Sequence, residues 1–310
     1  MVEKKILLAV DESVHSKQAV QYAARMSSAA QDMAYTLFNV EALVPRIFTT
    51  AAATDSEVRD RVAQLVRKNA DAARSAVQGC RDVMVREGIP ASRVETVTEP
   101  MQMGMAKDIL NRAEKGAYAA IVLARRALTP SRDFFIGTTA AKVVEHAIDI
   151  PVWIVAGEKI SMKIMVAVDG SENSLRDIEH LIHLVGARPD LQLTLFHVLS
   201  HLRHYYSVDF EVENPKLQEV LEREDKRRME AFYEEARQRL RTAGIKKTQI
   251  RLKTAARSHD ISTAILAEAK TGQYGTVVIG RRGERDAFFT GRIAMRLVQK
   301  VTDQTLWVVP

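Results

Sequence analysis

The chain has 310 residues, of which 46% are hydrophobic and 27% charged, and its formal net charge is +6. This length suits two average domains, and the composition is typical of a soluble globular protein. The single cysteine, Cys80, excludes a disulfide within the chain and is consistent with a reducing compartment. The longest apolar run near the start, Ile6–Val10, is too short for a signal-peptide core or a membrane helix. We therefore expect a cytoplasmic protein with no membrane partner.

The positive charge does not by itself indicate a nucleic-acid partner. Arginines and lysines are mixed with acids, as in Glu222–Arg241 (EREDKRRMEAFYEEARQRLR), which is typical of a solvated helix face. No recognised nucleic-acid-binding motif accompanies the charge, so we expect no nucleic-acid partner.

Short apolar strands and amphipathic helices are predicted to alternate along the first half, with polar turns or glycines between them. In chain order they are a strand over Lys5–Asp11, a helix over Ser16–Met26 with Ser16 as its N-cap, a strand over Tyr35–Val40, a helix over Ser56–Glu87 that stops at Gly88, a strand over Arg93–Thr98, a helix over Ala106–Ala113, a strand over Ile121–Leu123, a helix from Gly137, and a strand over Pro151–Val155.

The second half repeats this series. ILLAVDES, Ile6–Ser13, returns as IMVAVDGS, Ile164–Ser171, at an offset of 158 positions. The predicted elements are a strand over Lys163–Asp169, a helix over Ser174–Val185 with Ser174 as its N-cap, a strand over Leu193–Val198, a helix over Asn214–Ala243 that stops at Gly244, a strand over Gln249–Thr254, a helix over Ile261–Ala269, a strand over Val277–Ile279, a helix from Gly291, and a strand over Thr305–Val309.

Strict alternation of strands and helices predicts the fold class. Parallel neighbours need crossover connections, and near-continuous apolar strands indicate a sheet covered on both faces. We expect an α/β protein made of two similar doubly wound sandwiches, each a five-stranded parallel sheet with helices on both faces. The predicted domains are 1–158 and 159–310. The join, Gly157–Met162, is too short for a loose tether, so the halves are expected to pack on each other.

Candidate binding residues follow the strands. In an open α/β sheet, ligands lie beyond the carboxyl ends of the strands, where the strand order reverses. The loops after the fourth strands, Ala124–Thr139 (ARRALTPSRDFFIGTT) and Gly280–Arg292 (GRRGERDAFFTGR), each carry an arginine pair and run to a glycine that opens a helix. Helix N-termini and arginines both suit phosphate. These features predict a nucleotide or phosphate pocket.

At these residues the chain resembles the universal stress protein family, in a tandem arrangement that covers essentially the whole sequence. The resemblance rests on the two AVD turns, the final strands PVWIV and TLWVV, and the glycine loops after the fourth strands. The family's fold is a five-stranded parallel α/β sheet. Its nucleotide-binding members carry Gly-x2-Gly-x9-Gly-Ser/Thr after the fourth strand and an aspartate after the first.

Both copies of this loop depart from the family pattern. In the first, Ala124 and Ala127 replace the leading glycines, while the nine-residue spacer and the closing Gly137-Thr138 are intact. In the second, Gly280 and Gly283 are present, but the spacer Glu284–Thr290 has seven residues and Arg292 replaces the hydroxyl residue. Alanine disfavours positive φ and adds a methyl group where a backbone must approach phosphate. The first loop is nevertheless the better candidate, because its spacer length and its closing Gly137-Thr138 are intact.

The resemblance implies which residues would bind ATP or a related adenine nucleotide. Asp11, Val40, Asp169 and Val198 would face the adenine and ribose. Phosphates would lie against the two loops, at Ala124, Arg125, Arg126, Gly137, Thr138 and Thr139 in the first and at Gly280, Arg282, Gly283, Gly291 and Arg292 in the second.

Simpler structural roles compete with these. Aspartates after a strand often stabilise the following turn, glycines start helices, and the pairs Phe134-Phe135 and Phe288-Phe289 suit packing. The histidines, His180, His183, His197, His201 and His204, lack the companion ligands of a metal site, so no metal is expected. No nucleophile, base and orienting acid appear at a readable spacing, so no catalytic residues are predicted.

Three functions remain open from the sequence. The leading one is a non-enzymatic stress-response protein whose nucleotide occupancy tunes contacts with a protein partner. The second is a scaffold that has lost nucleotide binding, and the third is a slow ATPase. In the family the fifth strand commonly forms a dimer, so Pro151–Val155 and Thr305–Val309 are expected to make an intramolecular pseudo-dimer. Assembly into a homo-oligomer stays open.

Overall fold

The computed structural model describes residues 4–27, 32–125, 138–157, 160–199, 215–256, 258, 260–281 and 290–310. These residues form two compact units, the first ending at Val155 and the second beginning at Ala156. The predicted domain boundary between residues 158 and 159 falls on positions outside the described residues and stays a prediction. Within the described ranges, no helix combines the length and apolar character needed to span a bilayer.

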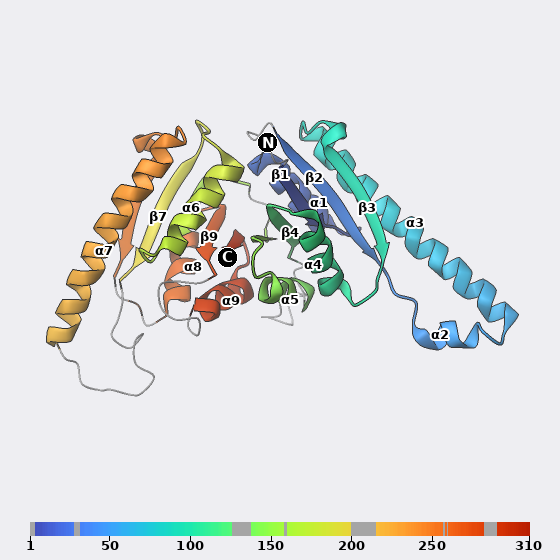
Figure 1. Cartoon of the computed structure of the whole chain (residues 1–310). Helices are drawn as coiled ribbons and strands as arrows, with labels where there is room; N and C mark the ends of the chain where they lie inside the picture. The colour runs from blue at the N-terminus through green and yellow to red at the C-terminus, as the bar shows by residue number, and fades with distance from the viewer. Residues whose placement is uncertain are drawn as a thin grey trace. The chain divides into compact units, whose positions relative to one another are not determined.

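The first unit is a five-stranded sheet with helices between its strands (Figure 1). Its strand order is β3-β2-β1-β4-β5, and every neighbouring pair is parallel. The elements are β1 (Lys4–Ala9), α1 (Val14–Met26), β2 (Met33–Glu41), α2 (Arg46–Ala51), α3 (Ser56–Arg86), β3 (Val94–Pro100), α4 (Met105–Gly116), β4 (Ala120–Ala124), α5 (Thr138–His146) and β5 (Val152–Val155).

The second unit repeats this topology. Its strand order, β8-β7-β6-β9-β10, matches that of the first unit element for element, again with parallel pairs throughout. The elements are β6 (Lys163–Ala167), α6 (Glu172–Val185), β7 (Gln192–Val198), α7 (Pro215–Thr242), β8 (Ile250–Ala255), α8 (Ile261–Thr271), β9 (Thr276–Gly280), α9 (Thr290–Lys300) and β10 (Thr305–Val309).

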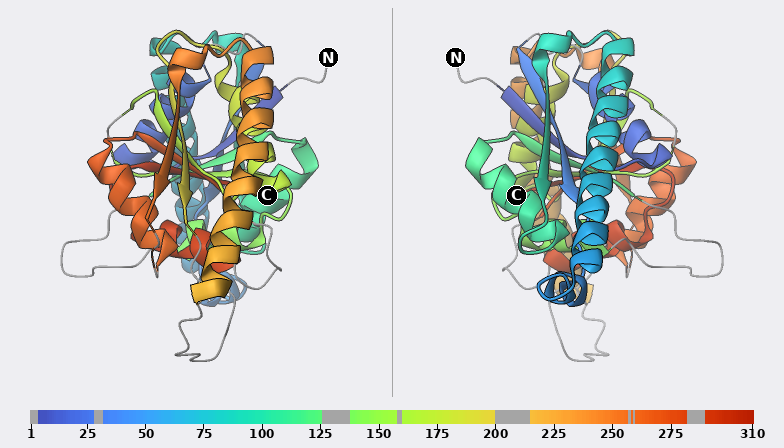
Figure 2. Two further views of the ribbon diagram at one scale, coloured as in Figure 1. Left: turned by 90° about the vertical axis from the view of Figure 1, so that its left-hand side faces the viewer. Right: turned by 90° about the vertical axis from the view of Figure 1, so that its right-hand side faces the viewer.

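Helices cover both faces of each sheet, as predicted. In the first unit α1 packs against α3, and α4 packs against α5; in the second, α6 packs against α7, and α8 against α9. Figure 2 shows α3 and α7 as the long helices of their units, and α3 also contacts β2 and β3. Central strands are buried on both sides, as at Ile6, Leu7 and Leu8 of β1. The predicted fold class is confirmed.

The two Gly-Ile pairs end the long helices in the same way. The amide of Gly88, at φ +90°, donates to the Val85 carbonyl, and the Ile89 amide donates to Met84. Gly244, at φ +87°, and Ile245 make the corresponding bonds. This Schellman arrangement needs a residue with positive φ, which glycine adopts without strain, and a buried apolar residue after it. The predicted helix stops are confirmed.

Three short elements were not predicted from the sequence. They are α2 and the 3₁₀ turns Ala91–Arg93 and Lys247–Gln249. None of them has a buried residue. Elements of this length leave no hydrophobic period in the sequence, because one turn is too short to show one.

Candidate functional site

The turn after the first strand of each unit is organised by an aspartate. In the first unit, Asp11 Oδ1 accepts the Ser13 amide at 2.9 Å and the Ser16 hydroxyl at 2.8 Å. The Asp11 amide donates back to Ser16 Oγ at 2.9 Å. This closed set of bonds fixes the entry into α1 and holds the half-exposed aspartate beyond the carboxyl end of β1.

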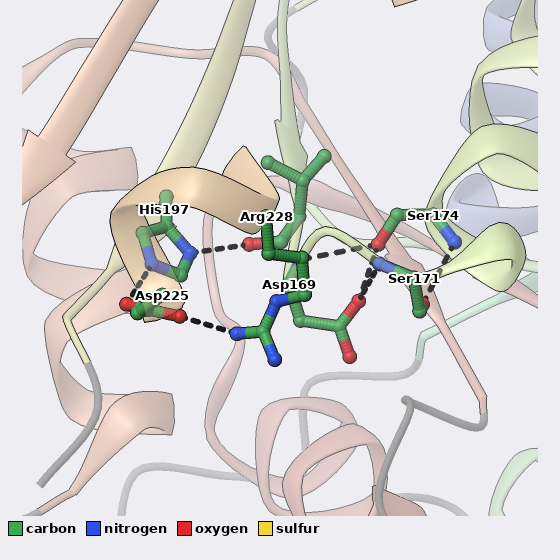
Figure 3. Close-up of polar contacts among 7 residues, drawn as sticks. Asp169, Ser171, Ser174, His197, Asp225 and Arg228 are labelled. Atoms are coloured by element: carbon green, nitrogen blue, oxygen red, sulfur yellow. Dashed lines mark hydrogen bonds and ion pairs between the residues drawn. The ribbon is translucent and has the colours of Figure 1, made fainter. Parts of the chain in front are cut away.

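The second unit builds the same turn from Asp169, Ser171 and Ser174 (Figure 3). Asp169 Oδ1 accepts the Ser171 amide at 3.0 Å and the Ser174 hydroxyl at 2.8 Å, and the Asp169 amide donates to Ser174 Oγ at 3.1 Å. One oxygen of each aspartate therefore stabilises its own turn, which was the simpler role considered for these residues.

The predicted N-caps are wrong by three positions. Ser13 and Ser171 cap α1 and α6, and their hydroxyls accept the amides of Ser16 and Ser174 at 3.2 and 3.3 Å. Ser16 and Ser174 lie inside the first helical turn, where their hydroxyls bond to the preceding aspartate instead. A serine three residues into a helix can reach back to the turn, much as glutamate does in a capping box.

The other first-unit candidates lie at neighbouring strand ends. Val40 is near the end of β2, which is paired with β1, and is 6% exposed. The half-exposed Ala124 ends β4, on the other side of β1. Arg125 donates its amide to the Val155 carbonyl at 2.8 Å, and burial lowers the pKa of its guanidinium. Thr139 lies half-buried in the first turn of α5. Asp11, Val40 and Ala124 thus share one edge of the sheet, at its switch point.

In the second unit, Val198 ends β7 and Gly280 ends β9, on either side of β6. Arg126, Gly137, Arg282 and Gly283 lie outside the described residues, as do Phe134-Phe135 and Phe288-Phe289. The backbones of Thr138, Gly291 and Arg292 belong to the first turns of α5 and α9, and nothing further is described of their side chains.

A buried acid of α6 lies near this edge and was not singled out from the sequence. Asp177 has no exposed surface, and neither carboxyl oxygen makes a hydrogen bond of normal geometry among the described residues. Burial and the neighbouring Asp169 raise the pKa of Asp177 well above its usual value, although the Gly280 backbone opposes the shift. The corresponding position of the first unit, 158 residues earlier, is Ala19. Comparing the two halves position by position is the signal that could have found it.

A second group joins β7 to α7 (Figure 3). His197 Nδ1 lies 3.0 Å from the Val168 carbonyl oxygen, and Nε2 lies 2.8 Å from Asp225 Oδ2. Arg228 donates from Nη2 to Asp225 Oδ1. His197 and Asp225 are 3% and 2% exposed. The carbonyl can only accept, so Nδ1 carries a proton, and a second proton must lie between Nε2 and Asp225.

The described ranges contain no cluster of three or more histidine, cysteine or acidic side chains placed to hold a metal ion. His197 pairs with Asp225 instead, and His180 lies edge-on to Trp307 with ring centroids 5.6 Å apart. His201 and His204 lie outside the described residues.

The sequence model of the universal stress protein family matches the chain twice, over residues 3–156 and 161–310. The chain belongs to this family. The two matches confirm the tandem resemblance inferred from the AVD turns and the glycine loops.

Two solved structures show the same fold. A universal stress protein from Archaeoglobus fulgidus DSM 4304 is 15% identical over 100% of this chain and 99% of its own, with a TM-score of 0.62. A functionally unknown protein from Pseudomonas aeruginosa PAO1 is 14% identical over 99% of this chain and 92% of its own, with a TM-score of 0.58. No curated protein sequence matches the chain.

Proposed function

We propose that this tandem universal stress protein is a cytoplasmic, non-enzymatic stress-response protein that binds ATP or a related adenine nucleotide at the carboxyl ends of its strands. Nucleotide occupancy would then tune contacts with a protein partner. The observation that carries the proposal is the aspartate turn, built twice, each time beside the strand that leads into a loop of the family's phosphate-binding type. The half-exposed carboxyl groups of Asp11 and Asp169 can accept hydrogen bonds from ribose hydroxyls.

Ligand-induced stabilisation tests this proposal. ATP at 100 times its dissociation constant would add about 2.7 kcal/mol to the stability of the unit that binds it, which raises Tm by several degrees. Asp11→Ala and Asp169→Ala should reduce the increase, whereas Asp60→Ala, which removes an exposed carboxylate of α3, should leave it unchanged. GTP and sulfate controls separate base recognition from general anion binding. No increase with ATP or AMP at millimolar concentration would contradict the proposal.

One observation favours a scaffold that acts only through protein contacts. The first loop has Ala124 and Ala127 in place of glycines, and the second has a spacer of seven residues and Arg292 in place of the hydroxyl residue. Absence of both a melting shift and co-purifying nucleotide would support this function. A phosphate-release assay separates the third function, because turnover abolished by Asp11→Ala would establish a slow ATPase.

We further propose that the two units associate as a pseudo-dimer through β5 and β10, the outermost strands within their own units. Such pairing would cover two exposed strand edges. Cysteines introduced pairwise along β5 and β10 should oxidise to a disulfide within one chain in at least one register. Cys80 is buried, which raises its pKa to about 11, so its thiol should not interfere. Cross-links formed only between chains, in every register, would contradict the pseudo-dimer.

A further inference from the structure

An arginine side chain lies directly on the turn that follows β6. Gly170 has φ +82°, and a Cβ built on it would lie 3.0 Å from Arg228 Nε and 3.1 Å from Arg228 Cγ. Met229 Sδ lies at 3.0 Å as well, so a side chain at this position would require Arg228 and Met229 to shift by a few tenths of an ångström. Figure 3 shows the guanidinium between Asp225 and the Asp169 turn. Arg228 thus reaches from α7 to the carboxyl end of β6, where sheets of this kind bind ligands.

The first unit has the opposite arrangement at the same place. Its turn carries an exposed side chain, Glu12, where the second has Gly170. Counting back from the helix-ending Gly88 and Gly244, which are 156 positions apart, α3 has Ala72 where α7 has Arg228. In the second unit the turn has no side chain at this position and the helix has a long one, so the two positions fit each other.

The residues that hold Arg228 also differ between the units. Asn39 stands where the second unit has His197, and its Nδ2 donates to the Val10 carbonyl at 2.7 Å. Asn69 stands where the second unit has Asp225, and bonds to the Ala42 carbonyl instead. Where the first unit has two amide side chains, the second unit therefore has a buried, charged hydrogen-bond network. The network runs from the Val168 carbonyl through His197 and Asp225 to Arg228.

This hydrogen-bond network holds the guanidinium of Arg228 as a pre-organised cation. Asp225 binds one edge of the guanidinium and is itself fixed by His197. With the proton that His197 and Asp225 share, the three side chains together carry a charge of about +1, because one carboxylate stands against the guanidinium and that proton. The Arg228 side chain is 26% exposed, so it is not fully enclosed by the protein, although its Nε is buried. A guanidinium held in this way loses little conformational entropy when it binds an oxyanion.

We propose that Arg228 is a ligand-binding and specificity-determining residue of the second unit, which takes the phosphate of a phosphorylated nucleoside. The nucleoside part of this inference rests on the proposed function. Asp169, one residue before Gly170, can accept hydroxyl groups of the sugar while the guanidinium donates to phosphate oxygens. The second unit should then prefer AMP to adenosine because of a contact between Arg228 and the phosphate, which the first unit, with Ala72 at this position, cannot make.

Hydrogen exchange on the intact chain can test this, because peptides covering 164–175 and 6–17 report separately on the two turns. The ligands are AMP, adenosine and pyrophosphate. Arg228→Gln should weaken AMP-dependent protection of 164–175 about tenfold, which is the size expected for loss of a hydrogen bond to a charged group. Protection by adenosine, and all protection of 6–17, should not change. Arg227→Gln, which removes an exposed arginine of the same helix, is the matched control and should behave as the parent chain.

The outcomes separate this inference from the proposed function. An unchanged preference for AMP in Arg228→Gln, or an equal loss of AMP and adenosine binding, would overturn the role of Arg228. If neither AMP nor adenosine protects any peptide, the proposed nucleotide function fails. If pyrophosphate protects 164–175 in the parent chain and this protection disappears in Arg228→Gln, the inference is still supported. If pyrophosphate does not protect 164–175 in the parent chain, the inference is overturned. If Arg228→Gln folds poorly, Arg228→Lys is the second variant. It keeps the positive charge but lacks the forked donors of the guanidinium, so it should show a smaller loss of the preference for AMP over adenosine.

Discussion

Replacing His197 with alanine is expected to lower the free energy of unfolding by about 3–5 kcal/mol. The substitution removes one member of a buried ion pair and takes from Asp225, which is 2% exposed, the His197 contact that accompanies its ion pair with Arg228. It also leaves the Val168 carbonyl without the donor that His197 supplies at 3.0 Å. Urea denaturation of the full chain, followed by circular dichroism, measures the loss.

His197→Asn is the matched variant, because the first unit shows what asparagine does at this position. Asn39 donates to the Val10 carbonyl, so an asparagine at 197 should restore the bond to Val168 without restoring the one to Asp225. Its destabilisation should fall between those of the parent and the alanine variant. If His197→Ala were as stable as the parent chain, the cluster would have to be hydrated rather than buried.

Replacing Asp177 with alanine should stabilise the protein at neutral pH by about 1–3 kcal/mol, the usual cost of a buried polar group without a partner. The carboxyl group has no exposed surface, and its pKa is raised by burial and by Asp169. Ala19 fills the corresponding position of the first unit at 3% exposure, so alanine is compatible with this packing.

The direction of the pKa shift of Asp177 determines how its effect on stability varies with pH. Because the pKa of Asp177 is higher in the folded than in the unfolded chain, the folded state retains the proton more strongly. Above roughly pH 4, the usual aspartate pKa, stability is therefore lost progressively as the pH rises toward the folded-state value. Asp177→Ala should abolish this loss, so its advantage should grow with pH. Urea titrations from pH 4 to 8 measure it, with Asp60→Ala as an exposed control, and an advantage that is constant or shrinks would count against the assignment.

Local sequence patterns were sufficient to predict the fold. Buried strands such as β1 and β10, the long helices α3 and α7, and the stops at Gly88 and Gly244 all follow from periodicity and turn chemistry within a few residues. Their alternation then restricts the topology to a parallel sheet with crossover helices, because few other arrangements bury such strands. The repeat at an offset of 158 supplied the second half without further argument.

The candidate site could be predicted only where it depends on chain order. Asp11 and Asp169 lie at strand ends because any residue directly after a strand does so. The exact caps were missed, since Ser13 and Ser16 both suit an N-cap and only the helix start decides between them. The mixed charges of Glu222–Arg241 predict a solvated helix face for Asp225 and Arg228, because such a pattern gives no sign that one carboxylate is buried.

By itself, therefore, the sequence determined that this protein has two doubly wound units of the universal stress type, with an aspartate at the same strand end in each. Only the tertiary structure decided that the units differ at that end, where Asp177 is buried and Arg228 rests on Gly170. The reason is physical. Periodicity is set by neighbours along the chain, whereas the burial of a charge and the partner of a guanidinium are set by residues dozens of positions away, brought together when α7 packs beside α6.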